Sequence, residues 1–381
     1  MKGIIDSTLR EGAQSPGIAF TATDKLAIVG LLDRLGIEEI ELGIATPHDP
    51  ALTDLFTACR KQKIRARLAL WCRCLKSDIH HAATLRPDIL SLSIPSSDIH
   101  LKERLRKDAR WAMRVTSEAI GQARALGIRQ ISVGMEDATR ADPTLLKQMC
   151  RTALEAGAVR VRLADTVGIA SPQSMQNLVR EIRAVCPLEI AVHTHNDFGM
   201  ATANSIAALE AGASWADATI LGLGERAGTS RLEELAGYLS LASGTREYQT
   251  RLLRPLCKLV ARAVERPINP QHPLIGRDIF TCESGLHLQG LTRNPATYEP
   301  YDPKLVGSCR RLLIGSKTGK RALSDKLSDL GYSLDKQTID KTLPLIRQHA
   351  MTAGRSLSDQ EISDLVTPSA AMTGSTSPQG A

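Results

Sequence analysis

Residues 23–42, TDKLAIVGLLDRLGIEEIEL, decide the fold of this chain because they join a helix directly to a strand. In the first part, residues 23–35, apolar side chains recur at helical spacing, and Gly36 follows as a stop signal. The second part, residues 37–42, is a short apolar run typical of a buried strand. Because residues 3–7 form another such run, the order strand, helix, strand is predicted, which favours a parallel sheet.

The same alternation recurs along the chain. Further strands are predicted at residues 66–70, 89–94, 130–133, 160–164, 189–193 and 215–220. Helices are predicted at residues 108–125, 143–156, 172–185, 201–211 and 231–243. About eight such units predict an α/β fold whose parallel sheet closes into a (β/α)8 TIM barrel. A doubly wound open sheet is the alternative, but a dinucleotide-binding sheet of that kind usually has a Gly-rich turn after its first strand, which this sequence lacks.

The chain has 381 residues, more than the roughly 250 that a barrel needs. Prolines punctuate it at Pro255, Pro267, Pro270 and Pro273. We therefore predict a barrel domain over residues 1–255, a linker with mainly helical C-terminal subdomains over residues 256–366, and a disordered tail over residues 367–381. In the second region, helices are predicted at residues 324–330, with Ser324 as N-cap, and at residues 338–347.

Composition and charge narrow the classes of function. Hydrophobic residues make up 43% and charged residues 23% of the chain, which allows a large core and excludes wholesale disorder. The net charge of +7 fits anionic small molecules or simply a basic soluble surface, whereas nucleic acid is disfavoured because aromatic residues make up only 3%. Scattered cysteines, no signal peptide and no apolar run near ~20 residues predict a soluble cytoplasmic protein with reduced thiols and no membrane partner.

Unusual polar residues fall where two predicted strands end. The first strand runs into DSTLREG (residues 6–12), which places Arg10 and Glu11 at the barrel mouth. The seventh ends in HTHND, where His193 and His195 are two apart and share one face of the strand. Two imidazoles and a carboxylate on a rigid scaffold predict a site for a divalent metal such as Mg²⁺ or Mn²⁺.

Longer motifs around these residues resemble a known family. DSTLREGAQSPG (6–17) and HTHNDFGMATANSIAALEAGA (193–213) resemble two signatures of the isopropylmalate, homocitrate and citramalate synthases. ADTVG (164–168), GLGERAGTSRLEE (222–234) and ESGLHLQG (283–290) match further landmarks in the expected order, so the resemblance spans roughly residues 1 to 320. WCRC (71–74), SIPSSDIHLKERL (93–105) and GMEDATRADP (134–143) resemble the nitrogen-fixation homocitrate synthases in particular.

The resemblance implies an acyltransferase that condenses acetyl-CoA with a 2-oxo acid and releases CoA. It implies metal ligands at Glu11, His193 and His195, and oxyanion stabilisation by Arg10. It further implies carboxylate binding by Thr166, a carboxylate near the acyl site at Glu41, a general base or acid at His287, and a nearby tyrosine at Tyr298. The family is also expected to form homodimers in which the segment bearing that histidine crosses to the other subunit. Three plainer interpretations stay open: Thr166 caps a helix, Glu41 pairs with an arginine, and Tyr298 only packs.

The 2-oxo acid is the least determined part of this prediction. We expect 2-oxoglutarate, giving homocitrate for a nitrogenase cofactor, with Ser93 and Ser97 of SIPSSD offering hydrogen bonds to the distal carboxylate. The homocitrate synthases of lysine biosynthesis are expected to carry an arginine in this region, and SIPSSD has none. Isopropylmalate or citramalate synthesis, a lyase of the same metal-barrel group, and a catalytically silent barrel that acts as a binding protein are the alternatives.

Two positions depart from the family pattern. Leu221 stands where the family usually has asparagine before Gly222, and Thr229 stands where it has asparagine after Gly228. Because the first asparagine normally lies near the metal, these changes predict altered surroundings of the metal ligands.

Overall fold

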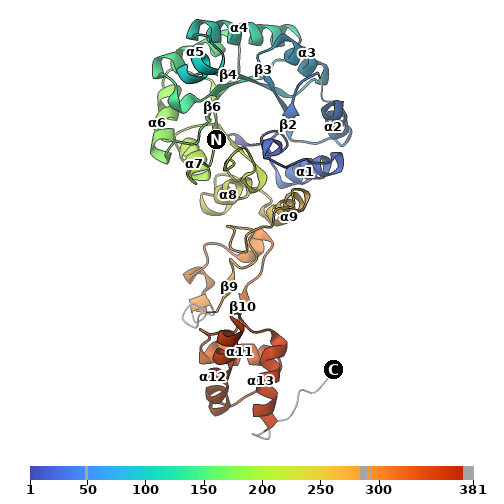
Figure 1. Ribbon diagram of the computed structural model, residues 1–381, viewed down its shortest axis with the longest axis vertical. Helices are drawn as coiled ribbons and strands as arrows, with labels where there is room; N and C mark the ends of the chain where they lie inside the picture. Colours follow the sequence, from blue (N-terminus) through green and yellow to red (C-terminus); the bar gives the residue numbers. More distant parts are fainter. Residues whose placement is uncertain (48–49, 284–289, 292, 372–381) are drawn as a thin grey trace. The chain divides into compact units, whose positions relative to one another are not determined.

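The computed structural model describes residues 1–47, 50–283, 290–291 and 293–371. Its centre is a closed parallel barrel in which the strands follow one another in chain order (Figure 1). The strands are β1 (Gly3–Asp6), β2 (Glu39–Ile44), β3 (Arg67–Arg73), β4 (Ile89–Pro95), β5 (Ile131–Glu136), β6 (Arg160–Asp165), β7 (Glu189–Thr194) and β8 (Trp215–Ala218). β8 pairs with β1 and closes the sheet, with Trp215 opposite Gly3. The predicted (β/α)8 barrel is therefore confirmed.

Helices surround this barrel (Figure 1). They are α1 (Ala22–Leu35), α2 (Pro50–Lys61), α3 (Lys76–Leu85), α4 (Ala109–Ala125), α5 (Pro143–Ala156), α6 (Pro172–Arg183), α7 (Ala201–Glu210), α8 (Leu232–Gly237) and α9 (Leu253–Ala263). The helix predicted at residues 231–243 is divided, because α8 ends at Gly237 and a π-helical turn, Tyr238–Ala242, continues it. No helix in the described part of the chain combines the length and apolarity that a membrane span needs.

The first helix shows why the sequence folds in this way. The Thr21 hydroxyl accepts a hydrogen bond from the Asp24 N–H, and the Asp24 carboxylate accepts one from the Thr21 N–H, which forms a capping box. Gly36 ends the helix in the left-handed conformation (φ 99°), which glycine adopts without steric cost. Ile28 and Leu32 are fully buried, so one face of the helix packs in the core.

The interior of the barrel is charged. Arg160 on β6 donates to Glu39 on β2 at 2.6 Å, and Arg162 on β6 donates to Glu41 on β2 at 2.7 Å. Because β2 and β6 are not neighbours in the barrel, these ion pairs cross its lumen. All four side chains are less than 6% exposed. Buried charges of this kind persist only when they are paired.

The chain divides into two units, Met1–Ile268 and Asn269–Ala381. The boundary predicted at residue 255 falls inside α9, which buries Leu253, Leu256 and Val260. Pro255 is tolerated there because it lies in the first turn of the helix, where a backbone N–H has no partner within the helix.

The second unit is mainly helical, as predicted. It contains a two-stranded sheet of β9 (Thr281–Cys282) and β10 (Arg311–Leu312), followed by α11 (Lys320–Asp329), α12 (Lys336–Ala353) and α13 (Asp359–Ala371). Its apolar core includes Leu323, Leu327, Ile346 and Ile362.

Details of this unit differ from the predictions. α11 begins before Ser324, so that residue is not its N-cap, and Gly319 takes this position without a side-chain hydrogen bond. The tail predicted to be disordered from residue 367 starts inside α13, which runs to Ala371, and residues 372–381 lie outside the described part of the chain.

Candidate metal centre and active site

Three predicted metal ligands meet at the mouth of the barrel. Glu11 follows β1, His193 lies on β7, and His195 comes directly after β7. One potential ligand atom from each lies within 4.8 Å of the others. The Nε2 atoms of the two histidines are 3.3 Å apart, and His193 Nε2 is 3.8 Å from Glu11 Oε2.

A hydrogen bond to Nδ1, on the side of the ring away from the other two ligands, fixes the orientation of His193. Its Nδ1 lies 2.9 Å from the Asp217 carboxylate, which assigns the proton to Nδ1 and leaves the Nε2 lone pair facing the other two ligands. Asp217 also accepts a hydrogen bond from Arg162 at 2.5 Å. Burial alone would raise the pKa of Asp217, but Arg162 and His193 outweigh it and lower this pKa to about 2. The carboxylate is therefore charged at neutral pH.

The electrostatics of the three ligands fit a divalent cation. Burial would raise the pKa of Glu11, but Arg10 and the two histidines hold it at about 2. Burial, and then His193, lowers the pKa of His195 to about 3, so this imidazole is neutral at physiological pH. Because His193 carries its proton on Nδ1, its Nε2 has no proton to donate to the neighbouring Nε2 of His195 or to the carboxylate of Glu11. A cation bound by all three groups would stabilise this arrangement.

A chain of ion pairs joins the metal ligands to the arginine beside them. Arg10 Nη1 donates to Glu11 at 2.5 Å, and its Nε donates to Glu41 at 2.6 Å. Glu41 in turn accepts from Arg162, which also donates to Asp217. The chain therefore links Glu11 to His193 through alternating positive and negative side chains, so the guanidinium of Arg10 is held in a fixed position next to the metal ligands.

These residues open into a cavity of about 250 Å³ at the C-terminal ends of the strands. Of the predicted site residues, Arg10, Glu11, Ser93, Thr166, His193 and His195 line it. Thr166 accepts a hydrogen bond from the Asp137 N–H at 2.8 Å, which leaves its hydroxyl proton able to donate into the cavity.

The remaining predicted residues are placed elsewhere. Glu41 is 1% exposed and lies behind Arg10. Ser97 is also 1% exposed, and its hydroxyl donates to Asp137 at 2.5 Å rather than lining the cavity. Tyr298 belongs to the second unit, where it is 53% exposed, and His287 lies outside the described residues.

Other residues at the cavity were not singled out in the sequence. Glu136 ends β5 and accepts hydrogen bonds from Ser93 at 2.8 Å and from Arg104 at 2.5 Å. Trp71 on β3 and Arg162 on β6 also line the cavity. The position of Glu136 in GMED, at the end of a predicted strand, was a usable signal, because barrel chemistry gathers at strand ends.

The two departures from the family pattern have local structural consequences. Leu221 adopts the left-handed conformation (φ 61°, ψ 13°), which asparagine tolerates better than leucine. Its backbone N–H donates to Glu233 at 3.0 Å. The Thr229 hydroxyl lies 2.9 Å from the Thr219 hydroxyl, so Thr229 is hydrogen-bonded inside the loop. Neither Leu221 nor Thr229 belongs to the described lining of the cavity.

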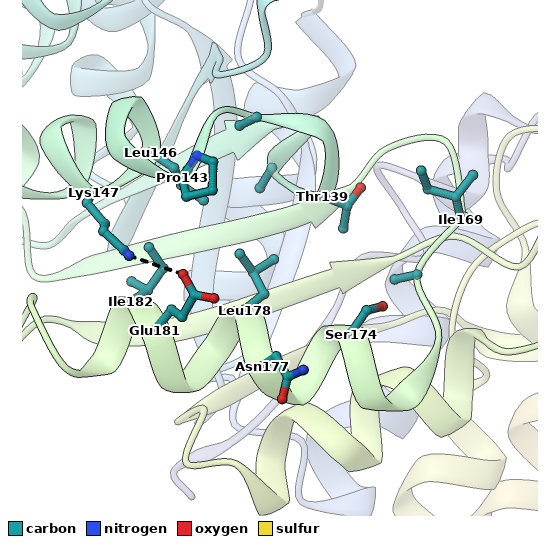
Figure 2. A pocket seen from close by; sticks show the side chains of 13 residues that line it. Thr139, Pro143, Leu146, Lys147, Ile169, Ser174, Asn177, Leu178, Glu181 and Ile182 are labelled. Atoms are coloured by element: carbon teal, nitrogen blue, oxygen red, sulfur yellow. Dashed lines mark ion pairs between the residues drawn. The ribbon is translucent and has the colours of Figure 1, made fainter.

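Figure 2 shows a second cavity, of about 400 Å³, between α5 and α6 and the loops that follow β5 and β6. Lys147 and Glu181 form an ion pair of 3.1 Å along it, while Thr139 and Ile169 lie near the strand ends. None of the described residues predicted to carry chemistry lines this second cavity, whereas six of them line the barrel cavity.

Comparison with known proteins places this chain in a family. Residues 2–260 match the family described as HMGL-like, and residues 274–354 match the one described as homocitrate synthase post-HMGL domain-like. A hydroxymethylglutaryl-CoA lyase from Pseudomonas aeruginosa has the same barrel fold, with a TM-score of 0.63 and 18% identity over 70% of this chain and 94% of that one.

Curated relatives are more similar in sequence. A homocitrate synthase of Frankia alni is 42% identical over 332 residues, which cover 86% of this chain and 93% of that protein. 2-Isopropylmalate synthase 2 of Caldanaerobacter subterraneus subsp. tengcongensis is 36% identical, covering 94% and 93% of the two chains. An (R)-citramalate synthase of Methanocaldococcus jannaschii is 35% identical, covering 96% and 74%. The chain therefore belongs to the HMGL-like family, in the group that includes the homocitrate, isopropylmalate and citramalate synthases.

Proposed function

We propose that this chain is a homocitrate synthase, which condenses acetyl-CoA with 2-oxoglutarate and releases CoA. The observation that carries the proposal is the convergence of Glu11, His193 and His195 beside Arg10 in one cavity. A homocitrate synthase is also among the relatives, at 42% identity. The use of the product for a nitrogenase cofactor belongs to the same proposal and rests on the motifs alone, whereas the proposed cytoplasmic location rests on the scattered cysteines.

The described residues can each take a step of this reaction. Glu11, His193 and His195 would hold a divalent cation, and the chemistry supplied there would be Lewis-acid polarisation of the keto group of the 2-oxo acid. Arg10 would stabilise the negative charge that develops on the keto oxygen as the new carbon–carbon bond forms. The hydroxyl of Thr166 would donate a hydrogen bond to the carboxylate next to that keto group.

Proton transfer requires a further group. A base must remove a proton from the acetyl methyl of acetyl-CoA before carbon–carbon bond formation, and imidazole operates near neutral pH. We assign this role to His287, with Tyr298 nearby, on the strength of the ESGLHLQG motif. Glu41 would act through Arg10, whose guanidinium it holds at 2.6 Å. Hydrolysis of the thioester then releases CoA.

A homodimer with exchanged C-terminal segments is part of the proposal. Four large apolar side chains are exposed on loops that follow barrel strands, where the cavity opens: Leu75 (46%), Ile99 (52%), Ile169 (49%) and Phe198 (70%). Exposed apolar groups at a functional face favour coverage by another protein surface. Light scattering coupled to size exclusion would test this, since a monomeric mass at micromolar concentration contradicts the exchanged dimer.

The test of function is CoA release by the purified protein with acetyl-CoA and Mg²⁺ or Mn²⁺. Three acids are compared: 2-oxoglutarate, pyruvate and 2-oxoisovalerate. Release with 2-oxoglutarate alone is the expected result. Preferential release with pyruvate or 2-oxoisovalerate would reassign the protein as a citramalate or isopropylmalate synthase. No release with any acid, although metal is bound, would favour a lyase or a silent barrel that acts as a binding protein.

A further inference from the structure

Three arginines line the barrel cavity, and they differ in how many carboxylates each guanidinium pairs with. Arg10 is held by Glu11 and Glu41, and Arg162 is held by Asp217 and Glu41. The third, Arg104, donates only from Nη2, to Glu136 at 2.5 Å, and its Nε and Nη1 make no hydrogen bond within the described part of the chain. Among the described arginines that line the cavity, Arg104 is therefore the one that pairs with a single carboxylate, whereas Arg10 and Arg162 each pair with two.

The loop that carries Arg104 is anchored rather than free. It follows β4 and forms a π-helical turn, His100–Arg104. The side chain of Leu101 in this turn is fully buried, and its N–H donates to the Ser97 carbonyl at 3.0 Å. The Lys107 N–H donates back to the Leu101 carbonyl at 2.9 Å, which closes the loop. Arg104 thus extends from a fixed base while its own side chain stays 51% exposed and able to adjust.

Arg104 lies on the side of the cavity opposite the proposed metal ligands, where the end of the substrate remote from its keto group would lie. The metal ligands come from the ends of β1 and β7, whereas Arg104, Ser93 and Glu136 come from the ends of β4 and β5. In the closed strand order β1 to β8, these two pairs of strands lie on opposite sides of the lumen. A 2-oxo acid whose keto and carboxylate oxygens face the metal ligands therefore extends its other end toward Arg104.

We propose that Arg104 determines specificity by binding the distal carboxylate of a 2-oxo diacid such as 2-oxoglutarate. The inference rests on the proposed condensing function. A carboxylate entering this side of the cavity would lose its hydration and needs a positive partner there. Arg104 supplies it by bridging the substrate carboxylate and Glu136, which the Ser93 hydroxyl holds in place. This arrangement places the arginine on the loop after SIPSSD rather than within it.

The test compares steady-state kinetics of CoA release in wild type, Arg104→Gln and Arg104→Lys, with 2-oxoglutarate and with the uncharged-tail acid that wild type accepts best. Arg104→Gln should raise KM for 2-oxoglutarate by about 100-fold, as expected for the loss of a charge-assisted hydrogen bond. Its kcat/KM for the uncharged-tail acid should stay within about 3-fold of wild type. Arg104→Lys should lie between wild type and Arg104→Gln for the diacid, since it keeps the charge but not the planar fork.

Lys102→Gln is the matched control, because it removes one positive charge from the same turn at a residue that does not line the cavity. It should leave KM for 2-oxoglutarate unchanged. If wild type condenses 2-oxoglutarate and Arg104→Gln does so with an unchanged KM, the assignment of Arg104 fails while the proposed function stands. An equal loss with both acids would also overturn it. If wild type does not use 2-oxoglutarate at all, the proposed function itself fails.

Discussion

The carboxylate of Asp217 contacts His193, a proposed metal ligand, on the Nδ1 side of its ring, whereas Nε2 faces His195. It holds His193 Nδ1 at 2.9 Å and is itself held by Arg162 at 2.5 Å. Asp217→Asn can keep the shape of this contact but loses the negative charge that fixes the proton on Nδ1. We expect a 10- to 100-fold weaker affinity for Mn²⁺, which is typical when such an outer partner of a metal ligand is changed. Isothermal titration calorimetry of the metal-free protein measures this.

Two variants calibrate that measurement. His193→Ala removes a proposed ligand and should lose bound metal and CoA release together. Asp142→Asn changes a carboxylate that only caps α5, and asparagine is an equally good cap, so metal affinity should stay at the wild-type value. Wild-type affinity in Asp217→Asn would show that the orientation of His193 does not depend on this charge.

Asp6 predicts a pH dependence of stability. Burial raises the pKa of its carboxyl from 3.8 to about 7, and the hydrogen bonds from Thr8 only partly oppose this. Between these two values the folded state holds a proton that the unfolded state releases. The free energy of unfolding contributed by this group therefore falls as pH rises from about 4 to about 7, by at most about 1.4 kcal/mol per pH unit, and is level above pH 7.

The contribution of Asp6 can be isolated with Asp6→Asn, which removes the titrating group. Urea unfolding of the metal-free protein at pH 5, 6, 7 and 8 should show wild type losing stability relative to Asp6→Asn up to about pH 7. Asp98→Asn changes an exposed carboxylate and serves as control. A constant difference between wild type and Asp6→Asn over this range would mean that Asp6 is already ionised at pH 5.

At the scale of elements, the loop between β8 and α8 carries strain. Leu221 has φ 61°, a conformation that costs an L-residue about 1–2 kcal/mol and that asparagine adopts more readily. Leu221→Asn should therefore raise the free energy of unfolding by about 1 kcal/mol, seen as a thermal midpoint higher by about 2–4 °C. Leu221→Ala keeps the β-carbon without a polar side chain and should not gain. Equal or lower stability of Leu221→Asn would mean that the apolar contacts of leucine outweigh the backbone strain.

The elements also show what the sequence can and cannot predict. Helical spacing and strand runs predicted the barrel, because each β–α unit buries one face locally, as Ile28 and Leu32 of α1 illustrate. The β1 and β7 motifs predicted a cluster of Glu11, His193 and His195, and the structure brings these three side chains together where the strands end. The position of Glu136 near a strand end could have been used, but its contact with Arg104 could not be predicted, because it depends on how the loop after β4 folds against the end of β5.

Pro255 illustrates a second limit of the sequence. A proline usually indicates a break, yet this one lies in the first turn of α9, so the first unit extends to Ile268. The ion pair of Arg160 with Glu39 also could not be predicted from the sequence, because the two residues lie far apart in the chain and their side chains meet only when the barrel closes.

At the scale of the whole molecule, the proposed metal ligands belong to the first unit, Met1–Ile268, whereas residue 287, the proposed base, falls within the range of the second, Asn269–Ala381. The unit Met1–Ile268 contains the closed barrel and every member of the metal cluster, so a chain of residues 1–268 should fold and bind Mn²⁺ with an affinity near that of the full chain. It should not release CoA from acetyl-CoA, because residues 269–381 carry the proposed base. Circular dichroism, calorimetry and the CoA assay measure these three properties.

His287→Ala in the full chain separates loss of the base from loss of the unit. This variant should keep metal and 2-oxo acid binding while its turnover slows by about 100-fold or more, the usual effect of removing a general base. CoA release by residues 1–268 at the rate of the full chain would remove His287 from the mechanism and direct attention to Glu136, a carboxylate that the first unit itself places at the cavity. Failure of residues 1–268 to fold would instead show that the barrel depends on the second unit, contrary to the separate core that each unit contains.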